Sequence, residues 1–173
     1  SNFQKSYGGE PNKIEIDSID KKIINLINQN SRLTNSEIGI KLNLNYKTIQ
    51  LRIKKMEERG IIEAYRTWMD FSKLGVSYYK AMIKLKKLEK DDEEKVLEFC
   101  KNHPNIIYLL TCVWPWDIEM EVQSESEKIF LEILREFREL MNNQIIDYET
   151  LTITEEYKLD YCPFSRELLK ILK

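Results

Sequence analysis

A segment that begins at Asn45 carries the residues of this chain that are best suited to binding chemistry. Ile49, Ile53 and Met56 recur at spacings of four and three, so they would stack on one face of a helix. The opposite face would present Lys47, Gln50, Leu51 and Lys54, with Lys55 beside them. Such a cationic, hydrogen-bonding surface on an exposed helix suits insertion into the major groove of DNA. The segment therefore predicts these DNA-binding residues: Asn45, Tyr46, Lys47, Thr48, Gln50, Leu51, Lys54 and Lys55.

Capping residues predict two shorter helices before this segment. Asp17 is a good N-cap for a helix over residues 18–28, and Thr34 with Glu37 forms a capping box that starts a second helix. Asn43 should close the second helix, so only one residue separates it from Asn45. A turn this short would hold two helices at a fixed angle, as in a helix-turn-helix.

The residues after the third helix indicate a wing. Gly60 readily adopts the left-handed conformation that follows many helices, and residues 61–70 are typical of a strand, with Tyr65, Trp68 and Met69 supplying bulk. The alternative is a three-helix bundle whose charged face is merely solvated. We favour the winged helix-turn-helix because the turn is tight, the polar face is cationic and a wing follows.

Charge is distributed unevenly along the chain. The 173 residues carry a net charge of -2, so global basicity gives no support for nucleic-acid binding. Residues 17–66, however, contain ten positive and six negative side chains, a balance of +4 that leaves -6 for the rest. A basic part joined to an acidic part is expected when only the first contacts phosphate. Arg52 lies nearer the packed side, and could hold a carboxylate such as Glu37 or reach a phosphate.

Cysteine usage and hydropathy exclude several classes of protein. Cys100, Cys112 and Cys162 lie far apart without a CxxC pair, and His103 is the one histidine, so we expect neither a disulfide framework nor a zinc site. No run of 18 apolar residues and no signal-type core occurs. We therefore expect a soluble, cytoplasmic protein of two domains. Residues 1–15 are predicted to be an arm or linker, which leaves open that the chain is part of a longer protein.

Hydrophobic periodicity predicts a second domain after the wing. The expected order is a strand at 80–86, a helix at 91–102, a hairpin of strands at 106–113 and 118–123, a helix at 125–141 and a strand at 145–155. The inward residues of the helices should be Val96, Leu97, Phe99, Ile129, Phe130, Ile133, Leu134, Phe137, Leu140 and Met141. This order is that of a ferredoxin-like βαββαβ domain, with both helices on one face of an antiparallel sheet. The fold class is therefore α+β.

The other sheet face should be polar and functional, because no further helix remains to cover it. Alternation would place Lys80, Lys84 and Lys86 beside Asp117, Glu119 and Glu121, with Thr150, Thr152 and Thr154 continuing the face. The acidic residues could instead be metal ligands or a catalytic pair. We favour a polar strand face neutralised by lysines, and we predict no metal, no cofactor and no catalytic residues.

These features resemble the Lrp/AsnC, or feast/famine, family of transcriptional regulators. The resemblance rests on residues 16–20, 30–34, 52–53, 59–62 and 71–75, and it extends over residues 16–161. It implies a DNA-binding domain at 16–70 and an effector and dimerisation domain at 71–161. The open sheet face would then join two subunits into a homodimer, often assembled further into octamers.

The resemblance also implies a small-molecule effector bound between carboxy-terminal domains. Family members bind amino acids near a hairpin of the form Thr-Gly-x-x-Asp. Here Asp117 fits the end of the motif, but Trp114 occupies the glycine position and Trp116 follows. The pocket would then be filled or would take an aromatic or larger ligand. Alternatively, the two tryptophans pack at a subunit contact. The candidate effector-binding residues are Trp114, Trp116 and Asp117.

Residues 162–173 are predicted to form a short helix. Ser165 could cap it, and its apolar residues, Leu168, Leu169, Ile171 and Leu172, should dock on the same subunit or on a partner.

The main functional expectation is a sequence-specific DNA-binding regulator that is not an enzyme. Siroheme decarboxylases resemble the same family, but such a site should need several histidines and arginines around the tetrapyrrole, and this chain has His103 alone. A ligand-sensing or scaffold protein with a vestigial helix-turn-helix is the third interpretation, which predicts negligible DNA binding.

Overall fold

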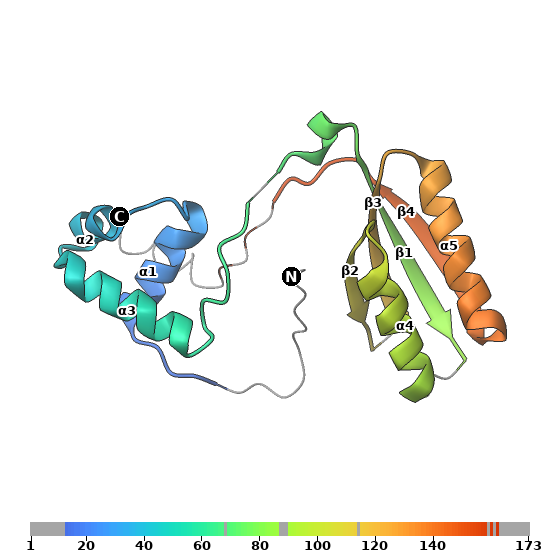
Figure 1. The fold of residues 1–173 in the computed structure, drawn as a ribbon, viewed down its shortest axis with the longest axis horizontal. Coiled ribbons are helices and arrows are strands. Elements are labelled where there is room, and N and C mark those ends of the chain that lie inside the picture. Colours follow the sequence, from blue (N-terminus) through green and yellow to red (C-terminus); the bar gives the residue numbers. More distant parts are fainter. Residues whose placement is uncertain are drawn as a thin grey trace. The chain divides into compact units, whose positions relative to one another are not determined.

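The chain folds into two compact units, each with its own hydrophobic core (Figure 1). The structure, a computed structural model, describes residues 13–67, 69–86, 90–113, 115–158, 160 and 162. Among these, residues 69–157 form one unit, and residues 13–67 together with 158, 160 and 162 form the other. No described helix has the length and apolar character required to cross a membrane.

The amino-terminal unit contains three helices whose starts agree with the predicted caps. They are α1 (Ser18–Gln29), α2 (Asn35–Leu42) and α3 (Tyr46–Glu58). The Asp17 side chain accepts hydrogen bonds from the first turn of α1, and Thr34 and Glu37 form the capping box of α2. The centre of the core consists of four apolar side chains that are almost inaccessible to solvent: Ile23, Ile38, Ile49 and Met56.

The turn between α2 and α3 is as short as predicted and is closed by backbone contact. Asn43 adopts a left-handed conformation with φ of 54°, and the Leu44 amide then donates to the Gly39 carbonyl at 2.8 Å. Asn45 caps α3 through a hydrogen bond from the Lys47 amide. The turn passes so close to α2 that a Cβ on Gly39 would lie 2.6 Å from the Leu44 carbonyl oxygen. At the far end of α3, Gly60 has the expected positive φ of 68°.

The prediction of a strand at 61–70 is wrong. The described residues of this segment take part in no strand ladder, and Trp68 lies outside the described residues. A strand is stable only when a neighbour accepts and donates its backbone hydrogen bonds, and the described part of the chain places none beside this segment. The segment instead runs without regular structure to the short 3-10 helix η1 (Phe71–Leu74).

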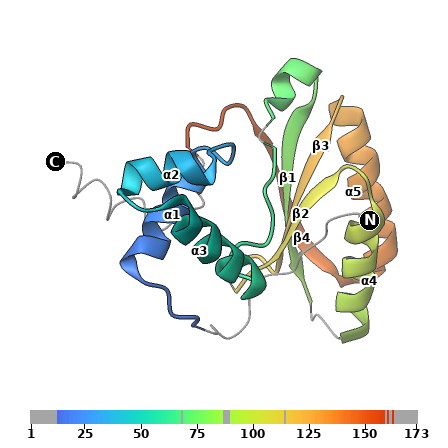
Figure 2. The ribbon, with the colours of Figure 1, turned by 60° about the vertical axis from the view of Figure 1, so that its left-hand side comes forward.

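The carboxy-terminal unit has the predicted ferredoxin-like topology. Its elements are β1 (Ser77–Leu85), α4 (Lys90–Asn102), β2 (Ile106–Thr111), β3 (Ile118–Ser124), α5 (Glu127–Met141), the short η2 (Asn142–Gln144) and β4 (Ile145–Ile153). The strands form one antiparallel sheet in the order β2-β3-β1-β4, and both helices cover the same face (Figures 1 and 2). The α+β fold class is therefore confirmed.

The core of this unit lies between the sheet and the two helices. Alternate residues of β1 and β3 are buried against α5, and the rings of Tyr79 and Phe130 stack with centroids 4.7 Å apart. Two predicted core residues lie at its margin, since Leu97 is 39% and Leu140 40% exposed. On α4 the buried partner of Val96 is Cys100, which lies four residues further along the same helical face.

The sheet face that the helices leave uncovered differs in part from the prediction. Lys80 does pair with the acids of β3, but Thr150 and Thr152 stand opposite Ala81 and Tyr79, on the helix-covered face. Residues directly opposite in a ladder share a face, so β4 contributes Leu151, the partner of Lys80, to the open face. We define the open face by Tyr78, Lys80, Met82, Tyr108, Leu110, Glu119, Glu121 and Leu151. Lys86 and Thr154 follow the ends of their strands.

The predicted short helix at 162–173 lies outside the described residues except for Cys162. That residue is buried and has no regular secondary structure.

Candidate nucleic-acid interface

One face of α3 packs into the core and the other is open to solvent. Ile49 and Met56 are fully buried, whereas the following predicted DNA-binding residues are exposed: Tyr46, Lys47, Gln50, Leu51, Lys54 and Lys55. We call these six residues the α3 surface. Leu51 is 67% exposed. Of the two other predicted residues, Asn45 uses its side chain as the N-cap and Thr48 is half-buried.

Arg52 belongs to α3, but its side chain contacts the start of α1 and is not part of the α3 surface. Its Nη1 lies 2.8 Å from Asp17 Oδ2 and 2.7 Å from Asp20 Oδ1. Hydrogen bonds to Asp20 and Asp17 raise the pKa of Arg52 above its ordinary value. Arg52 thus holds carboxylates, but not that of Glu37, the example that the sequence suggested. The Glu37 carboxylate accepts hydrogen bonds from Thr34 in the capping box of α2.

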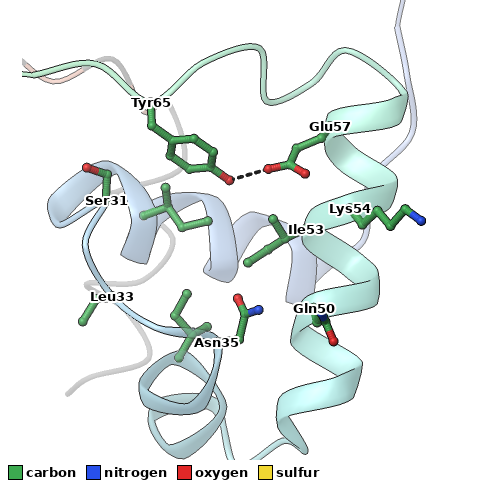
Figure 3. Close-up of a pocket in the computed structure, with 10 residues that line it drawn as sticks. Ser31, Leu33, Asn35, Gln50, Ile53, Lys54, Glu57 and Tyr65 are labelled. Atoms are coloured by element: carbon green, nitrogen blue, oxygen red, sulfur yellow. Dashed lines mark hydrogen bonds between the residues drawn. The ribbon is translucent and has the colours of Figure 1, made fainter.

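The lysines of the α3 surface remain accessible. Lys54 has one neighbouring carboxylate, with 3.7 Å between its Nζ and Glu58 Oε1, and both side chains are more than 60% exposed. An exposed pair at i and i+4 contributes only a few tenths of a kcal/mol, roughly 0.3–0.5, so a phosphate can readily replace Glu58. In Figure 3 the Lys54 side chain points away from the helical bundle.

A hollow of about 540 Å³ lies behind the α3 surface (Figure 3). Residues of all three helices and of the segment after α3 line it: Ile27, Ser31, Leu33, Asn35, Ile38, Gln50, Ile53, Lys54, Glu57 and Tyr65. The Tyr65 hydroxyl donates to Glu57 Oε1 at 2.8 Å. Burial and this carboxylate raise the pKa of Tyr65 to about 12, so the hydroxyl stays protonated and fixes the segment after α3 to that helix. No local sequence signal indicated this contact.

The candidate effector residues are only partly described. Trp114 lies outside the described residues, and Trp116 is half-buried. Asp117 braces the hairpin, because its Oδ2 accepts from the Leu85 amide at 2.7 Å and its own amide donates to the Ile83 carbonyl at 3.0 Å. The aspartate at this position therefore has a structural role in holding the β2–β3 hairpin against β1.

On the open face, one lysine pairs with two glutamates. Lys80 Nζ lies 3.2 Å from both Glu119 Oε1 and Glu121 Oε1, and the Tyr78 hydroxyl donates to Glu121. Burial lowers the pKa of Lys80, but the hydrogen bonds to Glu121 and Glu119 outweigh it, and the pKa lies above its ordinary value. Among the described residues, no group of three or more histidine, cysteine, aspartate or glutamate side chains could hold a metal ion.

Comparison with known proteins finds similarity to both units. A family profile described as "Winged helix-turn-helix DNA-binding" matches residues 16–63. The HTH-type transcriptional regulator LrpB of Bacillus subtilis is 45% identical over 65 residues, which is 38% of this chain and 44% of that protein. The chain thus matches less than half the length of this relative. The regulator PH0061 of Pyrococcus horikoshii is 28% identical over 144 residues. This match covers 76% of the present chain and 91% of PH0061.

Solved structures extend the similarity to the whole fold. The crystal structure of PH0061 has a TM-score of 0.74 at 26% identity and covers 86% of this chain and 99% of its own. Escherichia coli AsnC has a TM-score of 0.69 at 21% identity, covering 84% and 97%. The Neisseria meningitidis regulator NMB0573, solved as a complex with L-Met, has a TM-score of 0.77 at 18% identity, covering 88% and 99%.

The fold and the α3 surface define a winged helix-turn-helix protein with a ferredoxin-like second domain. The matches to LrpB, PH0061 and AsnC show that the chain is similar to regulators of the Lrp/AsnC type.

Proposed function

We propose that this protein is a sequence-specific DNA-binding transcriptional regulator that inserts α3 into the major groove. The observation that carries the proposal is the exposed α3 surface, in which Lys47, Lys54 and Lys55 surround Gln50 and Leu51. The lysines would contact phosphates or guanine, Gln50 would read adenine, and Leu51 would lie against a thymine methyl group. Asn45, Tyr46 and Thr48 complete the proposed interface at the start of the helix. Residues 16–70 would form the DNA-binding domain.

The active form would be a homodimer, or a larger assembly of dimers, joined through the open face of residues 71–161. Tyr108, Leu110 and Leu151 are all more than a third exposed on that face and surround the Lys80 ion pairs. Apolar residues around a cluster of internally paired charges suit a self-complementary contact across a two-fold axis. Two copies of α3 would then meet two DNA half-sites.

Selection from a random pool of DNA duplexes at fixed salt, with and without added amino acids, tests the DNA-binding proposal. The proposal expects an enriched sequence with two related half-sites. Recovery of a pool indistinguishable from the starting pool would contradict it and favour a vestigial helix-turn-helix.

A lysine substitution then assigns the contact to α3. Lys54→Ala with Lys55→Ala should weaken binding to the selected duplex and reduce the slope of log affinity against log salt by about 2, because each phosphate contact releases counterions. Lys128→Ala is the matched control, since Lys128 is an exposed helical lysine with the same i, i+4 glutamate pairing as Lys54. An unchanged slope in the α3 double variant would contradict the assigned interface.

We further propose a small amino-acid-like or aromatic effector bound near Trp114, Trp116 and Asp117. Support comes from the L-Met complex of the similar Neisseria regulator. A fluorescence titration with a panel of amino acids should give a saturable tryptophan signal. Asp117→Asn keeps an acceptor for the Leu85 amide but removes the charge, and should weaken binding about 10- to 100-fold if the carboxylate holds an ammonium group. Equal affinity in the variant would exclude that role.

A further inference from the structure

The hollow behind the α3 surface has the size and the lining of a small-molecule site. Its volume of about 540 Å³ lies within the range of about 300–1,000 Å³ that is common for such sites. The base is apolar, because Ile38 is buried and Ile27, Leu33 and Ile53 are half-buried against the core. A ligand with an apolar body would cover the parts of these side chains that still face water, which is favourable.

Uncharged polar side chains surround this apolar base. Ser31, Asn35 and Gln50 line the hollow, and none of the three side chains bonds to another residue in the described part of the chain. Each carries an oxygen that accepts hydrogen bonds. A few polar groups beside apolar surface fix the orientation of the ligand in small-molecule sites, and these three residues are placed to do so.

The charge of the lining is concentrated in one carboxylate. Among the described lining residues, Glu57 is the one acid and Lys54 is the one base. The Lys54 side chain points away from the helical bundle (Figure 3), and its Nζ lies 3.7 Å from Glu58, which is not part of the lining. Glu57 pairs with no lysine or arginine of the described residues, and its Oε2 has no partner among them. The hollow thus presents one unpaired negative charge.

Tyr65 holds this carboxylate in place. Its hydroxyl donates to Glu57 Oε1 at 2.8 Å, and Figure 3 shows the tyrosine and the carboxylate pointing toward one another. Because the pKa of Tyr65 is raised to about 12, the hydroxyl remains a donor at neutral pH. Oε2 of Glu57 is then left for a cationic donor, and the tyrosine ring adds an aromatic surface that also attracts cations.

We propose that the hollow is a binding site for a small organic cation with an apolar body. An amidinium or ammonium group of the ligand would pair with Glu57, and its apolar body would lie on the apolar base. Complementarity to the unpaired carboxylate favours a cation over an anion or a neutral compound. Gln50 and Lys54 belong to the α3 surface as well as to the hollow, so an occupied site would border two of the proposed DNA-binding residues.

4-Aminobenzamidine is a suitable probe, because it joins an aromatic ring to a planar amidinium that matches a carboxylate, and its fluorescence increases in apolar surroundings. Titration of the full chain should give saturable binding of one molecule per chain, with a dissociation constant below about 5 mM. 4-Aminobenzamide has a similar shape without the charge and should bind about fivefold more weakly. Absence of saturable binding, or equal affinity for the two compounds, would overturn the proposal.

Substitution of the carboxylate assigns the charge. Glu57→Gln keeps an acceptor for the Tyr65 hydroxyl and should weaken 4-aminobenzamidine binding about fivefold, to the level of 4-aminobenzamide. Glu58→Gln is the matched control, because it removes the same charge at the next position of α3, outside the lining, and should leave the affinity unchanged. An equal loss in both variants would show a general attraction between a cation and acidic side chains, and would overturn the site.

Amide chemical shifts of the full chain locate the bound probe. The signals of residues 31, 35, 50 and 57 should move with the dissociation constant found by fluorescence, whereas those of α5 should stay in place. Changes confined to the carboxy-terminal unit would place the probe elsewhere and overturn the proposal. None of these measurements uses DNA, so failure of this site leaves the DNA-binding proposal standing, and a failed duplex selection leaves this site standing.

Discussion

Arg52 illustrates how a cation on α3, the helix that we propose reads DNA, can instead bind other parts of the protein. Its guanidinium joins α3 to Asp17 and Asp20 at the start of α1, and its side chain is 28% exposed, against 69% for Lys54. The sequence predicted that Arg52 lies nearer the packed side, because its helical position follows from local periodicity. It did not identify the partners, because these are 35 and 32 residues away and depend on how α1 crosses α3.

The Arg52 pair makes stability dependent on pH. A backbone hydrogen bond from Asp20 and the pairing with Arg52 hold the pKa of Asp17 below its ordinary value. A lowered pKa in the folded state contributes stability that is present above the unfolded pKa and is lost as the pH falls through the folded one. The free energy of unfolding should therefore decrease below about pH 4.

Asp17→Asn tests this assignment, because asparagine keeps the N-cap and removes the charge. We expect a loss of less than about 1 kcal/mol at pH 7, since Asp17 is half exposed, and a smaller difference from the parent at pH 3. Denaturant unfolding at both pH values measures it. Glu94→Gln, an exposed change on α4, is the control and should have little effect at either pH. If the difference in the free energy of unfolding between Asp17→Asn and the parent were larger at pH 3 than at pH 7, the predicted direction of the pH dependence would be contradicted.

At the scale of elements, the helices were predictable and the sheet register was not. The caps at Asp17, Thr34 and Asn45 are local signals, and each was found where the sequence placed it. Strand β4 carries apolar and polar residues on both of its faces, so alternation alone did not show which side meets the helices. Its pairing with β1 decides this and places Thr150 opposite the buried Ala81.

The close approach of α2 to the following turn leaves no room for a side chain at Gly39. An added methyl group would meet the Leu44 carbonyl oxygen at 2.6 Å, and the backbone hydrogen bond between these residues prevents relief. Gly39→Ala should therefore destabilise the protein by about 1–3 kcal/mol. This is opposite in sign to the gain of about 1 kcal/mol expected from helix propensity.

Denaturant unfolding checks the Gly39 prediction. Ile40→Ala, at an adjacent position that is 81% exposed, should change the free energy of unfolding by no more than about 0.5 kcal/mol. A Gly39→Ala variant more stable than the parent would show that the turn can open at little cost.

At the scale of the whole molecule, the open face is the feature that suits self-association. The sequence predicted a polar face, whereas Tyr108, Leu110 and Leu151 make it partly apolar. The difference arises from strand pairing. Which residues of β2 and β4 lie on the open face depends on how β2 pairs with β3 and how β4 pairs with β1, and the sequence alone does not specify these registers. The hydrogen bond that Asn28 Nδ2 donates to Asp160 Oδ1 at 3.0 Å was unpredictable as well, because it joins residues 132 positions apart in sequence.

Leu151→Lys should shift the protein from dimer to monomer, because it places an unpaired charge in the proposed contact. Sedimentation velocity over a range of concentrations measures the change. Leu131→Lys is the matched control, since Leu131 is 51% exposed on α5, away from the open face, and should leave the sedimentation coefficient unchanged. Equal dimerisation in the two variants would exclude the open face as the contact.

The hydrogen bond between Asn28 and Asp160 has a topological consequence. Residue 28 comes before the whole carboxy-terminal unit in sequence and residue 160 comes after it, so the bond closes a loop of chain that contains that entire unit. A single backbone cleavage inside the loop would leave one fragment on each side of the bond, and the bond would oppose their separation.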